Sequence, residues 1–155
     1  MIYSTKYYDI YDRLVDLYYS TSECTKKLVF LCLLLILRNG LRASESIIAV
    51  EEFMKSLSRV VVIQSLKRGN QRHVVLPEEI SLFDILELKQ CINEVDRHLI
   101  KDYSRRYLKT SPHGLRRLYI NALNESGYTV EKIQQVVGHK YKKNTEYYIR
   151  DRNWS

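Results

Sequence analysis

The sequence predicts one mainly helical domain that carries a small antiparallel β-hairpin. Apolar residues recur at spacings of three and four along most of the chain, which is typical of helices with one buried face. A single stretch, residues 59–76, is instead rich in β-branched residues on both sides of a turn. The length of 155 residues suits one well-buried core and is short for two domains of ordinary size. We therefore expect a single domain over residues 1–155.

Three helices and then the hairpin are expected in the first half of the chain. The periodicity predicts helices over residues 5–19 and 26–37, and Asn39-Gly40 ends the second of them. A short helix over residues 43–50 follows. The strands are predicted at residues 59–64 and 72–76, and the turn Lys67-Arg68-Gly69-Asn70 between them places Lys67 near the tip of the hairpin.

Helices are expected to dominate the second half. Pro77-Glu78-Glu79 opens a largely helical stretch. Ser111-Pro112 predicts the start of another helix, because serine caps free backbone N–H groups and proline fits the first helical position, and Gly127 ends it. Thr129 can cap the next helix, which would end at Gly138. A last helix is predicted over residues 144–152.

The composition favours a polyanionic partner. Lys and Arg total 25 against 18 Asp and Glu, and the isoelectric point is near 9.3. Basic side chains that neutralise phosphates release condensed counterions, so DNA or RNA is a suitable partner, although charge alone does not separate nucleic-acid binders from other basic proteins.

The cysteines and the most apolar segment indicate a cytosolic protein. Cys24, Cys32 and Cys91 are odd in number, widely spaced and set in helix-like stretches, so we expect three reduced thiols. The apolar run of residues 28–37 is ten residues long, whereas a membrane span needs about 20, so it predicts a buried helix and no membrane partner. The tyrosines and aspartates of the N-terminus do not form a signal peptide.

Two short motifs could bind a phosphate. His113 and Arg116 lie three residues apart in the first turn of a predicted helix, beside free N–H groups and the positive end of the helix dipole. Arg42 follows Gly40 at the end of a buried helix, which would hold the guanidinium at a rigid junction. Taken singly, each motif also fits a local cap, a solvated surface arginine or an ordinary helix-end residue.

The ordered series of motifs resembles the catalytic domain of the tyrosine recombinases, the phage-integrase family. The series consists of Gly40-Leu41-Arg42-Ala43-Ser44-Glu45, the hairpin lysine, Ser111-Pro112-His113-Gly114-Leu115-Arg116-Arg117, Val137-Gly138-His139 and a tyrosine nine residues further on. The resemblance implies the catalytic residues Arg42, Lys67, His113, Arg116, His139 and Tyr148.

The resemblance also implies a role for each of these residues. Arg42 and Arg116 would grip non-bridging oxygens of the scissile phosphate, with Glu45 orienting Arg42. His113 and His139 would help to hold the developing charge, and Lys67 would be the general acid for the leaving 5′-oxygen. Tyr148 would be the nucleophile; Tyr147 is its immediate rival, and Tyr141 a more distant one.

The implied activity is that of a site-specific DNA recombinase or integrase, which cuts and rejoins DNA through a 3′-phosphotyrosine intermediate. No metal, nucleotide or other cofactor is expected. The expected partner is double-stranded DNA. We expect self-association into a tetramer in synapsis and an accessory DNA-binding protein as a further partner. The expected location is the cytoplasm, on the nucleoid when the protein is bound to DNA. Two alternatives share the same residues: a non-catalytic DNA-binding regulator derived from a recombinase, and an enzyme like a type IB topoisomerase.

The chain departs from the family pattern at both ends. About 25 residues, expected to form an N-terminal helix, precede the shared part, so we expect no separate core-binding domain. Seven residues follow Tyr148, whereas many relatives have a longer C-terminal segment. The sequence therefore predicts a minimal recombinase or one that needs a partner to hold DNA.

Overall fold

Helices make up most of the structure, a computed structural model that describes residues 5–64, 71–137, 145–146 and 149. The named elements are α1 (Thr5–Ser20), α2 (Cys24–Asn39), α3 (Ala43–Ser56), β1 (Val60–Gln64), β2 (Gln71–Val75), α4 (Leu82–Glu87), the 3-10 helix η1 (Leu88–Glu94), α5 (Arg97–Tyr103), the π-helical turn η2 (Ser104–Leu108), α6 (Pro112–Glu125) and α7 (Val130–Val137). The predicted fold class, mainly α with an antiparallel hairpin, is confirmed.

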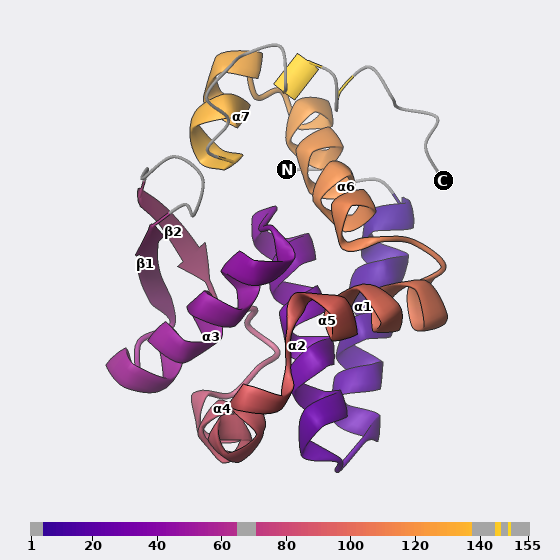
Figure 1. Cartoon of the computed structure of the whole chain (residues 1–155). Coiled ribbons are helices and arrows are strands. Elements are labelled where there is room, and N and C mark those ends of the chain that lie inside the picture. Colours follow the sequence, from indigo (N-terminus) through magenta and orange to yellow (C-terminus); the bar gives the residue numbers. More distant parts are fainter. Residues whose placement is uncertain (1–4, 65–70, 138–144, 147–148, 150–155) are drawn as a thin grey trace.

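Helix α2 forms the centre of the core. Every side chain from Leu28 to Leu37 is at most 2% exposed. Helices α1, α3, α5, α6 and η1 pack around α2, and Figure 1 shows it in the middle of the molecule. The prediction of a buried helix here is confirmed. Within the described ranges, no helix is long and apolar enough to cross a membrane.

The hairpin strands pair in antiparallel register, with Val62 opposite His73. Alternate side chains of both strands point to the protein interior, as period-two burial requires. One of these inward residues is an arginine, Arg72, which is 4% exposed. The connection between the strands, residues 65–70 with Lys67, lies outside the described residues.

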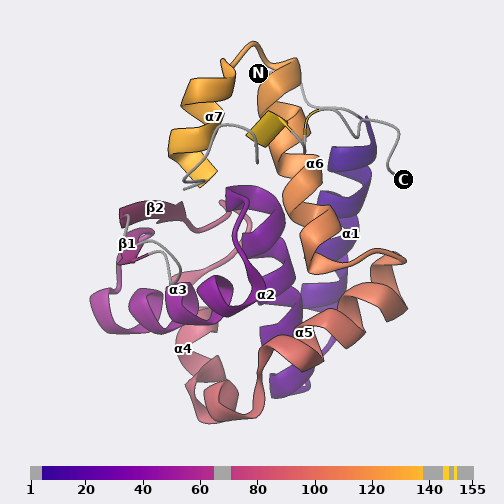
Figure 2. The same cartoon turned by 45° about the horizontal axis from the view of Figure 1, so that its top comes forward.

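The predicted N-terminal caps of two helices in the C-terminal half of the chain, Ser111 and Thr129, are confirmed. Ser111 Oγ accepts a hydrogen bond from Gly114 N (3.0 Å), and Pro112 opens α6. Thr129 Oγ1 accepts from Lys132 N (3.1 Å) at the start of α7. Figures 1 and 2 show α7 beside α6 and above the hairpin, so the two capped helices place the end of α7 next to β2.

Two predicted helix boundaries are wrong. Helix α3 continues to Ser56, beyond the predicted end at Val50. The stretch after Pro77 does not start as a helix: Ile80 N donates to Pro77 O (3.0 Å) in a turn, and α4 begins only at Leu82. The reason is Ser81, whose Oγ accepts from the N–H of the second helical residue and therefore caps the helix four residues later than expected.

The prediction of three reduced cysteines is also wrong. Cys24, at the start of α2, forms a disulfide with Cys91 in η1, with their Cα atoms 6.1 Å apart. Cys32 is the free cysteine and is buried. The thiols of Cys24 and Cys91 meet because η1 packs against α2, and a separation of 67 residues gives no sign of that contact in the sequence.

Reducing this disulfide should destabilise the protein by about 4 kcal/mol, because a cross-link over a loop of this length restricts the unfolded chain. The measurement is denaturant unfolding with and without a reductant such as TCEP. A Cys24→Ala/Cys91→Ala double variant should be insensitive to the reductant, whereas Cys32→Ala should respond as the wild type does. Equal stability of the wild type under both conditions would contradict this prediction.

Candidate functional site

Arg42 stands at a tightly constrained turn between α2 and α3. Gly40 ends α2 in the left-handed conformation (φ 67°), and its N–H donates to Ile36 O (2.8 Å). A Cβ at Gly40 would lie 2.3 Å from Cδ2 of Tyr119, so the ring of this α6 residue packs directly on the turn. Arg42 follows in extended conformation as the N-cap of α3. The backbone that carries Arg42 is therefore held between two helices.

Glu45 connects the backbone and the side chain of Arg42. The Glu45 carboxylate is fully buried, and its Oε1 accepts a hydrogen bond from Arg42 N (2.8 Å). Its Oε2 lies 3.6 Å from Arg42 Nη1, an ion pair beyond hydrogen-bond distance. Arg42 Nη1 is itself buried and has no hydrogen-bond partner among the described residues. This geometry supports the expectation that Glu45 orients Arg42.

The N-terminal end of α6 carries the second group of basic residues. His113 is exposed to solvent, whereas Arg116 and Arg117 are 2% and 7% exposed. Arg116 Nη2 donates to Val137 O (2.9 Å), the last carbonyl of α7. Because the first N–H groups of a helix and its dipole favour negative charge, this end of α6 suits an anion.

The two groups of basic residues both act electrostatically on His113. Partial desolvation of the imidazole lowers the pKa of His113, and the charges of Arg117, Arg116 and Arg42 lower it further. A charge acts this way only from nearby, so three guanidinium groups lie within electrostatic reach of the ring. The structure thus brings together Arg42, His113 and Arg116 from α3 and α6. We call Arg42, Arg116 and Arg117 the arginine cluster.

Arg117 was not singled out from the sequence. It follows Arg116 directly, and because neighbours on a helix point about 100° apart, a partner for Arg116 is expected three or four residues away. Its burial and its effect on His113 became visible only in the fold.

Three of the six predicted catalytic residues lie outside the described residues: Lys67, His139 and Tyr148. The rival tyrosines Tyr141 and Tyr147 lie outside them too. In the predicted last helix, Thr145, Glu146 and Ile149 are helical, and Ile149 packs against the core. The roles of Lys67, His139 and Tyr148 stay predictions.

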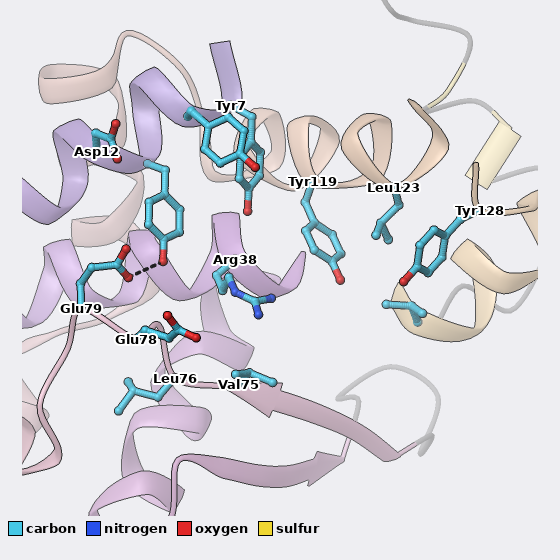
Figure 3. A pocket seen from close by; sticks show the side chains of 13 residues that line it. Tyr7, Asp12, Arg38, Val75, Leu76, Glu78, Glu79, Tyr119, Leu123 and Tyr128 are labelled. Carbon is cyan, nitrogen blue, oxygen red and sulfur yellow. Dashed lines mark hydrogen bonds between the residues drawn. The ribbon is translucent and has the colours of Figure 1, made fainter. Parts of the chain in front are cut away.

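A pocket of about 660 Å³ lies elsewhere, where α1, α6, α7 and β2 meet the end of α2. Figure 3 shows Arg38 at its centre, and the Tyr11 hydroxyl donates to Glu79 Oε1 (2.8 Å) at one side. Its described lining residues include the carboxylates of Asp12, Glu78 and Glu79 but none of the predicted catalytic residues. This excess of negative charge does not suit a phosphate, so the pocket is not the phosphate site.

Metal ligands do not gather in the described part of the chain. There, no group of three or more histidine, cysteine, aspartate or glutamate residues is placed to hold a metal ion.

We expect the imidazole of His113 to titrate below its ordinary pKa of 6.5, because desolvation and the arginine cluster disfavour its charged form. NMR titration of the ring measures this midpoint. Arg117→Gln removes the largest charge effect and should raise the midpoint, whereas Lys101→Gln removes an exposed cation on α5 and should not. A midpoint above 6.5 in the wild type would refute the arrangement.

The lowered pKa of His113 also makes the stability of the folded protein depend on pH. Because the unfolded chain binds a proton at His113 more readily than the folded chain does, the free energy of unfolding decreases as the pH falls from about 6.5 through the folded pKa. This contribution is fully present above pH 6.5.

Comparison with known proteins finds a matching family model and a similar viral protein. Residues 87–153 match the phage integrase family, and the matched range includes His113, Arg116, His139 and Tyr148. The putative integrase ORF241 of Acidianus two-tailed virus is 30% identical over 148 residues, which cover 89% of this chain and 59% of the viral protein.

A solved structure shares the fold. The crystal structure of XerA recombinase superposes with a TM-score of 0.57 at 18% sequence identity, and the match covers 96% of this chain and 59% of that one. The chain therefore spans about three fifths of the length of both relatives.

Proposed function

Since the chain belongs to the phage-integrase family, the tyrosine recombinases, we propose that it cuts and rejoins double-stranded DNA at specific sites through a 3′-phosphotyrosine intermediate. The relatives are longer than this chain, so recombination by the chain on its own is part of the proposal.

The observation that carries the proposal is the convergence of cationic side chains at the N-terminal end of α6. Arg116 and Arg117 are buried there, and the charge of Arg42 also reaches His113. Arginine pairs phosphate oxygens through two parallel hydrogen bonds and keeps its charge at any relevant pH, so the site suits a phosphodiester.

The proposed reaction is a transesterification at phosphorus. The Tyr148 hydroxyl loses its proton and attacks the scissile phosphate, the bond to the 5′-oxygen breaks, and Lys67 gives that oxygen a proton. Arg42, Arg116 and His139 hold the charge on the non-bridging oxygens. His113, whose lowered pKa favours the neutral imidazole, can accept the tyrosine proton.

The phosphotyrosine bond conserves the energy of the broken phosphodiester. A 5′-hydroxyl from another strand can therefore reverse the step and join a new strand without a nucleotide. Because side chains supply the positive charge, we propose that cleavage proceeds without a divalent metal. Synapsis would require a tetramer on DNA, with an accessory DNA-binding protein where this chain alone does not enclose the duplex.

The test is covalent capture from a pool of nicked duplexes of randomised sequence, in the presence of EDTA. Cleavage beside a nick releases a short strand, so the enzyme stays attached to DNA and survives denaturation in SDS. We expect such adducts, and sequencing the attached DNA reveals the target site. DNA binding without any adduct would instead identify a non-catalytic regulator, and relaxation of supercoiled plasmid by a monomer would identify a topoisomerase-like enzyme.

A further inference from the structure

Arg72 connects the end of α2, which precedes Arg42 in the sequence, to the end of α7, which precedes His139. It lies on β2 and points into the protein, where its guanidinium contacts α2, α3 and α7. The sequence suggests for Arg72 only a place in the hairpin. Its contacts assign it a more specific role.

Each guanidinium nitrogen of Arg72 has a partner. Its Nη2 and Nη1 donate to Asn39 O (2.6 Å) and Gly40 O (3.3 Å), the carbonyls that end α2 just before Arg42. Its Nε donates to Val136 O (2.9 Å), at the end of α7. One rigid, planar group thereby fixes the end of α2 relative to the end of α7.

The Glu45 carboxylate joins Arg72 to the arginine cluster. Its Oε1 lies 3.7 Å from Arg72 Nη1, and its Oε2 lies 3.6 Å from Arg42 Nη1. Glu45 thus stands between two guanidinium groups, and the position of Arg72 influences how the carboxylate meets Arg42.

The end of α7 is held by two arginines at once. Arg116 donates to Val137 O (2.9 Å) and Arg72 to the preceding carbonyl, Val136 O. In the sequence, Val137 is followed directly by Gly138 and His139. The segment that leads into His139 is therefore anchored by one residue of the proposed phosphate site and by Arg72.

We propose that Arg72 is a positioning residue of the recombinase site, which sets the spacing between Arg42 and the last turn of α7. This inference rests on the proposed function, because it concerns the geometry of that reaction. Misplacing catalytic groups by about 1 Å can lower a rate by about 100-fold, which is the size of effect expected when these contacts are lost.

The variant Arg72→Gln is suited to the test because β2 stays attached to α2 without Arg72. The Asn39 side chain donates from Nδ2 to Val75 O (2.9 Å) and accepts at Oδ1 from Val75 N (2.9 Å). The matched control is Arg59→Gln. Arg59 also binds three backbone carbonyls, those of Leu76, Pro77 and Ile80, but it does not reach α7.

The experiment measures single-turnover adduct formation at saturating nicked DNA, together with the dissociation constant for DNA. We expect Arg72→Gln to slow adduct formation about 100-fold with the dissociation constant within about threefold of wild type. Arg59→Gln should be less stable than the wild type but form the adduct at the wild-type rate. Arg72→Lys retains the positive charge beside Glu45 but lacks the several N–H donors of a guanidinium group, so its rate should be intermediate. A wild-type rate in folded Arg72→Gln would overturn the proposal.

Hydrogen exchange separates failure of this proposal from failure of the proposed function. Arg72→Gln should lose protection at the amides of the last turn of α7, and Arg59→Gln should not. If the wild type forms no adduct, the proposed function fails, and the exchange result still shows whether Arg72 fixes α7. If Arg72→Gln does not fold, Arg72→Lys is used for both the rate of adduct formation and the hydrogen exchange. Unchanged exchange in the last turn of α7 in either folded variant would overturn the positioning role.

Discussion

Replacing Tyr148 with phenylalanine is expected to abolish covalent attachment to DNA while leaving DNA affinity unchanged. The proposed nucleophile is the phenolic oxygen, and phenylalanine removes that atom but keeps the ring. Without a covalent intermediate there is no strand transfer, so the adduct should fall below detection. The measurement is adduct yield on the captured target DNA, with binding followed in parallel.

Tyr147→Phe is the matched control for this experiment. Adjacent residues on a helix point about 100° apart, so only one of the two tyrosines is expected to face the phosphate. Tyr147→Phe should therefore retain adduct formation. If Tyr147→Phe is inactive and Tyr148→Phe is active, the assignment of the nucleophile is wrong by one residue.

Gly40→Ala is expected to be the most destabilising small substitution at the turn that carries Arg42. An alanine there adopts a left-handed conformation, which costs about 1 kcal/mol, and its Cβ would lie 2.3 Å from the ring of Tyr119. Either the ring of Tyr119 or the turn must move to make room. Overpacking of this kind costs a further amount of about 1–3 kcal/mol. We expect a total loss of about 3 kcal/mol in the free energy of unfolding, measured by denaturant titration.

Gly127→Ala separates the two causes. Gly127 also has a positive φ of 93°, but apart from its two chain neighbours no described residue has an atom within 4 Å of the position of an added Cβ. This variant should lose only the conformational part, about 1 kcal/mol. Equal losses in the two variants would mean that contact with Tyr119 does not constrain the turn. Because that turn precedes Arg42, Gly40→Ala should also weaken DNA binding, whereas Gly127→Ala should not.

Local signals explain which parts of the structure were predictable. The start of α6 follows from Ser111 and Pro112, and the end of α2 from Gly40, because caps act over four residues or fewer. The pairing of Arg42 with Glu45 is equally local, since the two lie three residues apart in one helical turn. The convergence of Arg42 with His113 required the resemblance to a known family, because nothing near either residue indicates the other.

Contacts between distant segments explain what was missed. Arg72 binds carbonyls 33 and 64 residues away, and Cys24 meets a cysteine 67 residues along the chain. A backbone carbonyl is present at every residue, so no side-chain pattern marks the partners of Arg72, and nothing near Cys24 indicates that its partner is Cys91. The sequence marks Asn39 only as part of a helix stop, yet its side chain pairs with the backbone of Val75 on β2.

The burial of α2 has a consequence for how the protein opens and closes in solution. Amides in such a central helix exchange with solvent only when the whole domain unfolds, whereas peripheral elements exchange through local openings. The turn that holds Arg42 begins at the last residue of α2, so we expect this half of the site to be among the slowest-exchanging parts of the chain. On heating, the capacity of Arg42 to bind phosphate should therefore persist until global unfolding.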